Sequence, residues 1–399
     1  MATNCTPFSP FRRPLAISTL LAIPLPAMAQ NQPAPAWALL DHRADDLIEL
    51  SGQWIGEYSS IIDGGLANED GFRDLLSIDL AVDLDRLFGL ENTTAFAQLQ
   101  SINPSRAGSA DAGDLQGYSN IEIDRSLDVI YELWIEHTLD ACNLRLKVGK
   151  IDANTEFAGI DIAGGFSNSS AGFSPTIFTL PTYPDPATGV VLFWEPSETL
   201  SIGYGFFDGS LAADAVLTGG RGPSTFFNDD RSNDWFHIAQ VTHRWDSGSL
   251  TIGAWHHTGT FSHFDVSTHD QTSGFFSTLT QQVYANDESD QALSLFAQLA
   301  SAAPSISETH HHFGLGMVLD APLPSRQDDQ AGLYASHAKL SSEPGAGFDS
   351  NETAIDAYYA LTIHPNLTLR PEIQHIINPS GAQGVDNATI IGLRIECTF

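Results

Sequence analysis

Two acids, an indole and two bases share a predicted surface near the middle of the chain. In Glu132-Leu-Trp134-Ile-Glu136 the carboxylates and the indole alternate with apolar residues, so all three face one side of a strand. The next alternating segment places Arg145 and Lys147 on its polar face. Acids and Arg can bond hydroxyl groups, and an aromatic surface can stack on the apolar face of a sugar ring. The mixture favours a neutral polyol over an ion, because a phosphate pore is expected to present rings of Arg and Lys.

A long connection rich in Gly, Ser, Asn and Pro follows this surface, over residues 152–187. Connections of that length without regular structure are uncommon in a compact domain and are usually functional. This one carries five aromatic residues, which a solvated linker rarely does: Phe157, Phe166, Phe173, Phe178 and Tyr183. We expect it to fold, and we expect Asp152 and Asn154 at its base to extend the polar surface. The alternative is a mobile surface loop.

A plainer interpretation applies to all of these polar side chains. They could satisfy one another on a wet wall, where an ion pair contributes only about 0–1 kcal/mol. The same holds for Arg370 and Glu372, which alternate with apolar residues near the C-terminus and which we also assign to the pathway of a solute.

Period-two alternation dominates the chain after residue 47 and predicts an all-β fold. Leu76, Ile78 and Leu80, for example, alternate with Ser77 and Asp79. About sixteen such segments are expected, near 47–58, 76–84, 93–101, 128–138, 142–151, 188–195, 199–207, 234–246, 248–258, 275–285, 291–300, 310–320, 329–338, 353–363, 366–377 and 388–399. No segment shows a sustained helical period.

The connections between these strands alternate in length. Short ones, as at 140–141, 196–198, 246–248 and 364–366, alternate with long ones near 62–74, 102–127, 152–187, 208–233, 259–274, 301–309, 339–352 and 378–387. Tight turns on one side and long loops on the other are typical of a transmembrane antiparallel β-barrel of the outer membrane. The last strand is amphipathic and ends on Phe399, which resembles the signal that such barrels present to their assembly machinery.

The N-terminus predicts export. Arg12 and Arg13 precede an apolar run, and Ala27-Met-Ala29 ends it with small residues, as in a secretory signal peptide. The run is shorter than the ~20 residues of a spanning helix, so a membrane anchor is the weaker interpretation. We expect a signal peptide at 1–29, a lead-in segment at 30–46 and a barrel domain at 47–399.

Charge and motifs exclude several function classes. The chain has 17 Lys plus Arg against 49 Asp plus Glu, a net charge of -32, which opposes binding to nucleic acid. It contains neither G-x-S-x-G nor H-E-x-x-H, and its three cysteines form no C-x-x-C pair. Consecutive strand residues face opposite sides, so His310, His311 and His312 cannot all face one metal ion. We predict no catalytic residues, metal or cofactor, and no enzyme activity.

Two blocks of sequence resemble the carbohydrate-selective porin (OprB) family. The first comprises Leu144-Arg-Leu-Lys-Val-Gly-Lys-Ile-Asp152 with Asn154 and Phe157, then 167–176 and 180–186 leading to Gly189-Val190; the second comprises 369–379, Gly392-Leu-Arg394 and Phe399. The resemblance implies a sixteen-stranded outer-membrane porin that passes mono- and small oligosaccharides. It also implies that the third outer loop, expected at 152–187, folds inward and narrows the pore. The barrel prediction itself places the apolar face against outer-membrane lipid, and a homo-oligomer is possible. Two alternatives stay open: a structural or adhesive barrel with a closed lumen, and a secreted all-β sugar-binding module.

Overall fold

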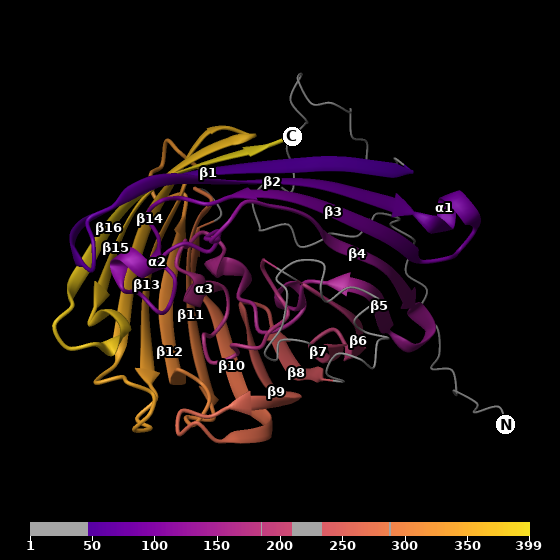
Figure 1. The fold of residues 1–399 in the computed structure, drawn as a ribbon. Helices are drawn as coiled ribbons and strands as arrows, with labels where there is room; N and C mark the ends of the chain where they lie inside the picture. Colours follow the sequence, from indigo (N-terminus) through magenta and orange to yellow (C-terminus); the bar gives the residue numbers. More distant parts are fainter. Residues whose placement is uncertain (1–46, 185, 210–233, 287–288) are drawn as a thin grey trace.

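Sixteen antiparallel strands close into one barrel, in which each strand pairs with its neighbours in sequence and β16 pairs with β1 (Figure 1). The computed structural model describes residues 47–184, 186–209, 234–286 and 289–399. The strands are β1 (Ile48–Gly65), β2 (Asp70–Asp83), β3 (Thr93–Asn103), β4 (Leu127–Leu139), β5 (Leu144–Ile151), β6 (Ala187–Ser197), β7 (Leu200–Asp208), β8 (Trp235–Trp245), β9 (Gly248–Ser262), β10 (Thr268–Asn286), β11 (Gln291–Ala302), β12 (Thr309–Asp320), β13 (Gln330–Leu340), β14 (Glu352–His364), β15 (Leu367–Ile377) and β16 (Asp386–Thr398). The predicted signal peptide at 1–29 and lead-in at 30–46 lie outside the described residues.

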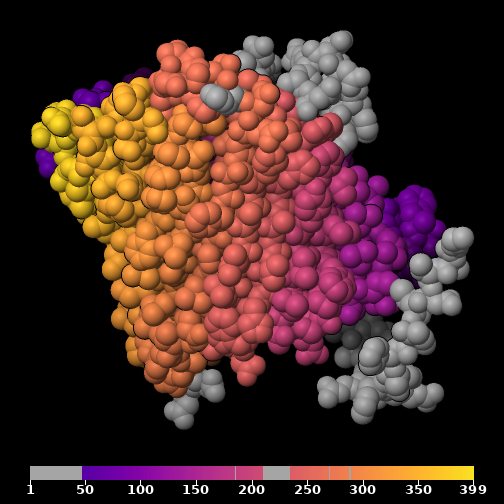
Figure 2. Space-filling model, turned by 90° about the horizontal axis from the view of Figure 1, so that it is seen from below, coloured from indigo at the N-terminus to yellow at the C-terminus, as the bar shows by residue number. Residues whose placement is uncertain are grey.

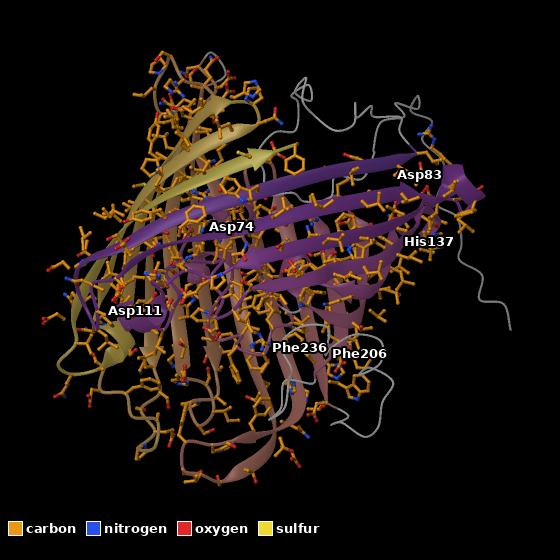
Figure 3. All side chains as sticks on the ribbon, turned by 45° about the horizontal axis from the view of Figure 1, so that its top comes forward. Asp74, Asp83, Asp111, His137, Phe206 and Phe236 are labelled. Carbon is orange, nitrogen blue, oxygen red and sulfur yellow. The ribbon has the colours of Figure 1, made fainter. Side chains whose placement is uncertain are left out.

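The two faces of the barrel follow the alternation of the sequence. Leu80 is exposed on the outer face, whereas its neighbour Asp79 is buried on the inner face. Large apolar residues cover the outer wall, along which successive strands lie side by side in Figure 2. Phe206 of β7 and Phe236 of β8, both labelled in Figure 3, show the same contrast, since Phe206 is half-buried whereas Phe236 is fully buried. Because the barrel is closed, no strand among the described residues is left with an edge of unpaired backbone groups, as a sheet in lipid requires.

The strands are joined by short turns at one end of the barrel. β4 and β5 are joined by one turn of 3₁₀ helix, η1 (Asp140–Cys142), and β8 and β9 by two residues. The β2–β3 turn contains α1 (Leu84–Phe88), whose N-cap, Asp83, accepts a hydrogen bond from the backbone of Arg86 at 3.1 Å. No helix in the described part of the chain has the length and apolarity to cross a membrane.

Two long loops at the opposite end contain short helices. Residues 104–126 include α2 (Ser109–Ala112), and residues 152–186 include η2 (Ala153–Thr155), η3 (Asp161–Ala163) and α3 (Ser169–Gly172). Asn168 caps α3 by accepting a hydrogen bond from the Ser170 backbone at 3.1 Å. The expected loop at 208–233 lies almost wholly outside the described residues.

Two of the connections expected to be long are short. The interpretation of 62–74 as a loop is wrong, because β1 continues to Gly65 and β2 begins at Asp70. Similarly, β9 and β10 leave only 263–267 between them, instead of 259–274. Backbone ladders continue past the apolar band through polar residues, such as the Ser60–Asp70 pair, so alternation of hydrophobicity ends before the strand does.

Candidate functional site

Strands β4 and β5 bring the predicted acids and bases together on the inner wall. Their register places Glu136 opposite Lys147. Arg145 Nη1 lies 2.8 Å from Glu136 Oε2, and Lys147 Nζ lies 3.4 Å from the same oxygen. Glu132, Glu136 and Lys147 are all buried. The Glu136 carboxylate thus contacts both Arg145 and Lys147 on the next strand.

A third acid completes this cluster from the loop. Just after η2, Glu156 Oε2 lies 2.6 Å from Arg145 Nη2, and its Oε1 lies 2.5 Å from Lys147 Nζ. Burial alone would raise the pKa of Glu156, but Lys147 and Arg145 outweigh burial and lower this pKa below its usual value. Glu156 belongs to the same loop as Asp152 and Asn154, but only those two were assigned to the predicted pathway.

Asp152 and Asn154 join the same patch, where they hold the base of the loop. The Asp152 backbone donates to Glu132 Oε1 at 2.8 Å, and Tyr131 Oη donates to Asp152 Oδ2 at 2.5 Å. Asp152 Oδ1 accepts from the Asn154 backbone at 2.8 Å, and burial raises the pKa of this carboxyl above its usual value. All seven residues predicted around β4 and β5 therefore lie in one patch.

Trp134 has a different environment from the one expected. Lys147 Nζ lies 3.9 Å from the centroid of its ring, and the Phe96 ring stacks on it with centroids 4.8 Å apart. Only 4% of the residue is exposed. The expectation of a free face for a sugar to stack on is therefore wrong; the indole is packed between its neighbours.

Arg370 and Glu372 lie on β15, in a second cluster of charges with β1, β2 and β16. Arg394 Nε donates to Glu57 Oε2 at 2.9 Å, and Arg73 Nε lies 3.5 Å from Glu57 Oε1. Arg370 pairs with Glu396 on the neighbouring strand. Arg73 was missed because 62–74 was interpreted as a loop. In β2 its side chain is buried, whereas its neighbours Phe72 and Asp74 are more exposed.

The loop at 152–186 crosses the lumen and is anchored on the far wall. The Phe166 ring packs against Phe296 of β11, Tyr334 of β13 and Tyr358 of β14, with centroids 5.8, 5.5 and 4.9 Å apart. The neighbouring Ser167 Oγ donates to Glu372. The Asn168 backbone donates to Asp356 of β14 at 3.1 Å. The predicted inward course of this loop agrees with these contacts.

The loop at 104–126 also folds inward, which the sequence did not predict. Glu352 of β14 accepts hydrogen bonds from the backbone of Leu115 and Gln116 at 3.0 and 3.1 Å. Gln374 of β15 donates to the Tyr118 carbonyl at 2.6 Å. The length of this loop was evident from the sequence, but the residues to which it is hydrogen-bonded lie more than 200 positions away.

The two inward loops are bonded to each other inside the barrel. The Asn120 backbone donates to the Ser167 carbonyl, and the Ser169 backbone donates to the Gly117 carbonyl, both at 2.8 Å. Together they form one structure in the interior of the barrel. We call residues 104–126 and 152–186 the inward loops.

The histidine run has other partners. His310 Nδ1 is 2.8 Å from the Ala302 carbonyl, and His312 Nε2 is 2.7 Å from Ser336 Oγ. Within the described ranges, no three His, Cys, Asp or Glu side chains are grouped as metal ligands.

Known proteins resemble this chain in both sequence and fold. The family described as carbohydrate-selective porin, OprB family, matches residues 66–399. Porin B of Pseudomonas aeruginosa is 25% identical over 156 residues, a stretch that spans 34% of each protein. The high-pH structure of Pseudomonas putida OprB superposes with a TM-score of 0.78 at 17% identity, covering 88% of this chain and 94% of that one. Salmonella typhi OmpF, in complex with daunomycin, superposes with a TM-score of 0.54 at 12% identity, covering 88% and 97%.

Proposed function

Because this chain belongs to the OprB family of carbohydrate-selective porins, we propose that it lets mono- and small oligosaccharides diffuse passively through its barrel. Its location is the outer membrane, where a closed barrel with an apolar outer face is stable. The family is one of channels, and we assign the chain no catalytic role. The observation that carries the proposal is the pair of inward loops, which are bonded to each other inside a barrel whose inner wall carries ion-paired side chains.

We assign the solute path to the patch on β4 and β5 and to two charged residues on β15. The first comprises Glu132, Trp134, Glu136, Arg145, Lys147, Asp152 and Asn154, and the second Arg370 and Glu372. Arg145 is the member best placed to meet a solute, since 31% of its side chain is exposed while its two acid partners are buried. Its ion pairs fix the guanidinium in place, which leaves its remaining N–H groups pre-oriented for hydroxyl groups. Trp134 supports this arrangement from beneath Lys147.

Liposome swelling tests the proposal. Vesicles carrying the purified barrel should swell in glucose much faster than empty vesicles, and faster than in a charged solute of similar size. Arg145→Ala should weaken block of the ion current by glucose about three- to ten-fold, which corresponds to about 0.7–1.4 kcal/mol. Arg145→Lys keeps the charge but loses the planar guanidinium, so its block by glucose should lie between that of the wild type and that of Arg145→Ala. A barrel that conducts no ions would instead favour the closed-lumen alternative.

The proposed partners are the sugar, the surrounding lipid and the assembly machinery, with a homo-oligomer possible. Phe399 lies on the seam of the barrel, where its backbone exchanges hydrogen bonds with Gly52 at 2.7 and 2.9 Å. We propose that the assembly machinery binds this aromatic residue before β1 and β16 pair and close the barrel. Removal of residues 1–29 during export remains a prediction, tested by sequencing the N-terminus of the membrane-extracted protein.

A further inference from the structure

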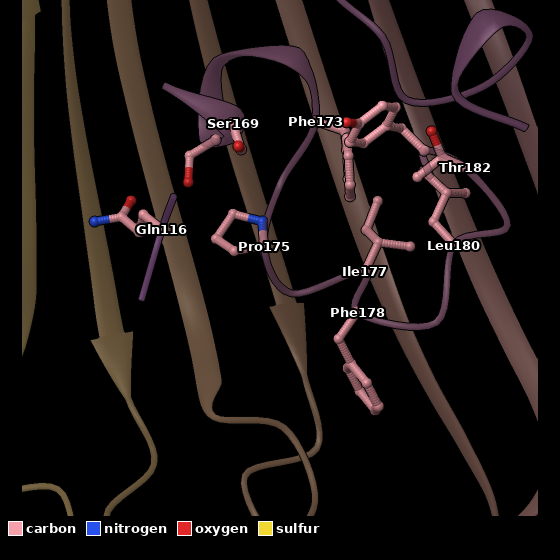
Figure 4. A pocket seen from close by; sticks show the side chains of 10 residues that line it. Gln116, Ser169, Phe173, Pro175, Ile177, Phe178, Leu180 and Thr182 are labelled. Atoms are coloured by element: carbon pink, nitrogen blue, oxygen red, sulfur yellow. The ribbon is translucent and has the colours of Figure 1, made fainter. Parts of the chain in front are cut away.

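We propose that a cavity between the two inward loops is a binding subsite for one neutral pyranose ring. This inference rests on the proposed function and names a place where the sugar pauses. The cavity has a volume of about 250 Å³ and is shown in Figure 4. Its lining includes Gln116, Ser169, Ser170, Phe178 and Tyr183. The volume is just below the ~300–1,000 Å³ of ordinary small-molecule pockets, so it suits a single ring better than a chain.

The cavity is uncharged, in contrast to the walls around it. None of its lining residues is Asp, Glu, Lys, Arg or His, although the chain carries 49 acids and 17 Lys plus Arg. The phenol of Tyr183 donates to the Ile121 carbonyl at 3.0 Å. An ion in this cavity would lose its hydration without gaining a counter-charge, which is costly. The lining therefore selects a neutral solute.

An aromatic ring is held in place at the cavity with part of its surface free. Phe178 meets Trp255 and Phe261 edge-to-face, with centroids 5.8 and 6.0 Å apart, so the barrel wall fixes its orientation. It is nevertheless 41% exposed. Unlike Trp134, whose ring is covered, Phe178 offers an oriented apolar face of the kind on which a sugar ring stacks.

A buried hydroxyl at the cavity has no hydrogen-bond partner among the described atoms. Ser170 is 1% exposed and its Oγ is unpartnered. Its backbone is fixed, because its carbonyl accepts hydrogen bonds from Gln298 at 2.6 Å and from Tyr334 at 2.9 Å. Leaving a buried hydroxyl unpaired is unfavourable, and a sugar hydroxyl could supply the missing bond.

The subsite belongs to both inward loops. Gln116 comes from residues 104–126, and the other lining residues come from residues 152–186. Ser169, which lines the cavity, also makes one of the two backbone bonds between the loops. A sugar in the cavity would contact both loops and should strengthen their association.

Glucose block of single channels tests the subsite on the full-length barrel in planar bilayers. Phe178→Ala should raise the half-blocking glucose concentration about three- to ten-fold, because a stacking face is lost, and Phe178→Tyr should keep it near wild type. Ser170→Ala should raise it about two- to five-fold, with little risk to folding. Phe348→Ala is the matched control, since Phe348 packs on Phe264 in outer loops and does not line the cavity.

Two outcomes would overturn the inference in different ways. If glucose passes and blocks the wild type but Phe178→Ala and Ser170→Ala keep its half-blocking concentration, the subsite is wrong while the proposed function stands. If the wild type neither passes glucose nor is blocked by it, the proposed function fails and the subsite fails with it.

Discussion

The Lys147 ammonium nitrogen lies 3.9 Å from the centre of the Trp134 ring, diagonally across the β4–β5 pair, in which Trp134 is paired with Gly149. The same nitrogen lies 2.5 Å from Glu156, so the inward loop, the cation and the indole form one packed unit. A cation over an indole face is favourable, the more so when it is removed from water. Trp134 is therefore part of the support beneath the charged patch.

We predict that Trp134→Ala destabilises the barrel by about 3–5 kcal/mol, the usual cost of removing a large buried aromatic. Trp134→Phe should cost less, because an aromatic face remains for Lys147 and Phe96. Urea unfolding of the barrel in lipid vesicles measures both. Equal stability of wild type and Trp134→Ala would show that the packed unit contributes nothing.

The anchor of the second inward loop should control channel width. Phe166→Ala removes the contacts with three strands on the far wall, so single-channel conductance should rise and become noisier. Phe206→Ala removes the same side chain from the outer face and should leave conductance unchanged. An equal change in both variants would point to a general effect on the barrel.

The two faces of one strand should respond oppositely to the same new charge. Leu99→Arg places a cation on the exposed outer face of β3 and should cost about 2–4 kcal/mol near the bilayer midplane. Gln98→Arg places it inside, next to Asp79, to which Gln98 Nε2 now donates at 2.7 Å. It should fold normally and shift ion selectivity away from cations. Folding yield and reversal potential distinguish the two, and equal losses of yield would contradict the face assignment.

The docking of the first inward loop should weaken as pH rises. Burial is the main cause that raises the pKa of Asp114 well above its usual value, and the negative charge of Glu352 is the next. The charge of Glu122 raises this pKa further. A raised pKa in the folded state means that the protonated form favours docking. This stabilisation is complete below the ordinary pKa of ~3.9 and is lost as pH rises through the raised value.

Hydrogen exchange of the amides in residues 109–120 measures this dependence. After correction for intrinsic exchange rates, protection in the wild type should fall with rising pH. Asp114→Asn replaces the proton with an amide donor that does not titrate, so its protection should stay flat. A wild type as flat as this variant would exclude Asp114 as the titrating group.

The barrel, its approximate number of strands and its two faces could all be predicted from the amino-acid sequence. Alternation such as that of Leu80 and Asp79 reports directly which side of a sheet a residue takes, because side chains in a strand repeat every two residues. A short turn also makes neighbouring strands antiparallel partners, so the meeting of Glu136 with Arg145 and Lys147 could be predicted from the sequence. Both relations are local, so the spacing of residues in the sequence predicts them.

The contacts that fill the interior of the barrel are visible only in the folded protein. The contacts of Phe166 with Tyr358 and of Gln116 with Glu352 join residues about 190 and 236 positions apart, and no period or turn rule links them. The packing of other side chains on Trp134 could not be predicted either, because alternation shows that a residue points inward but not what packs on it. Irregular loops bond through single backbone groups and isolated side chains rather than a repeating ladder. The two faces of the barrel wall could therefore be predicted from the sequence, whereas the contacts of the inward loops form only when the barrel closes around them.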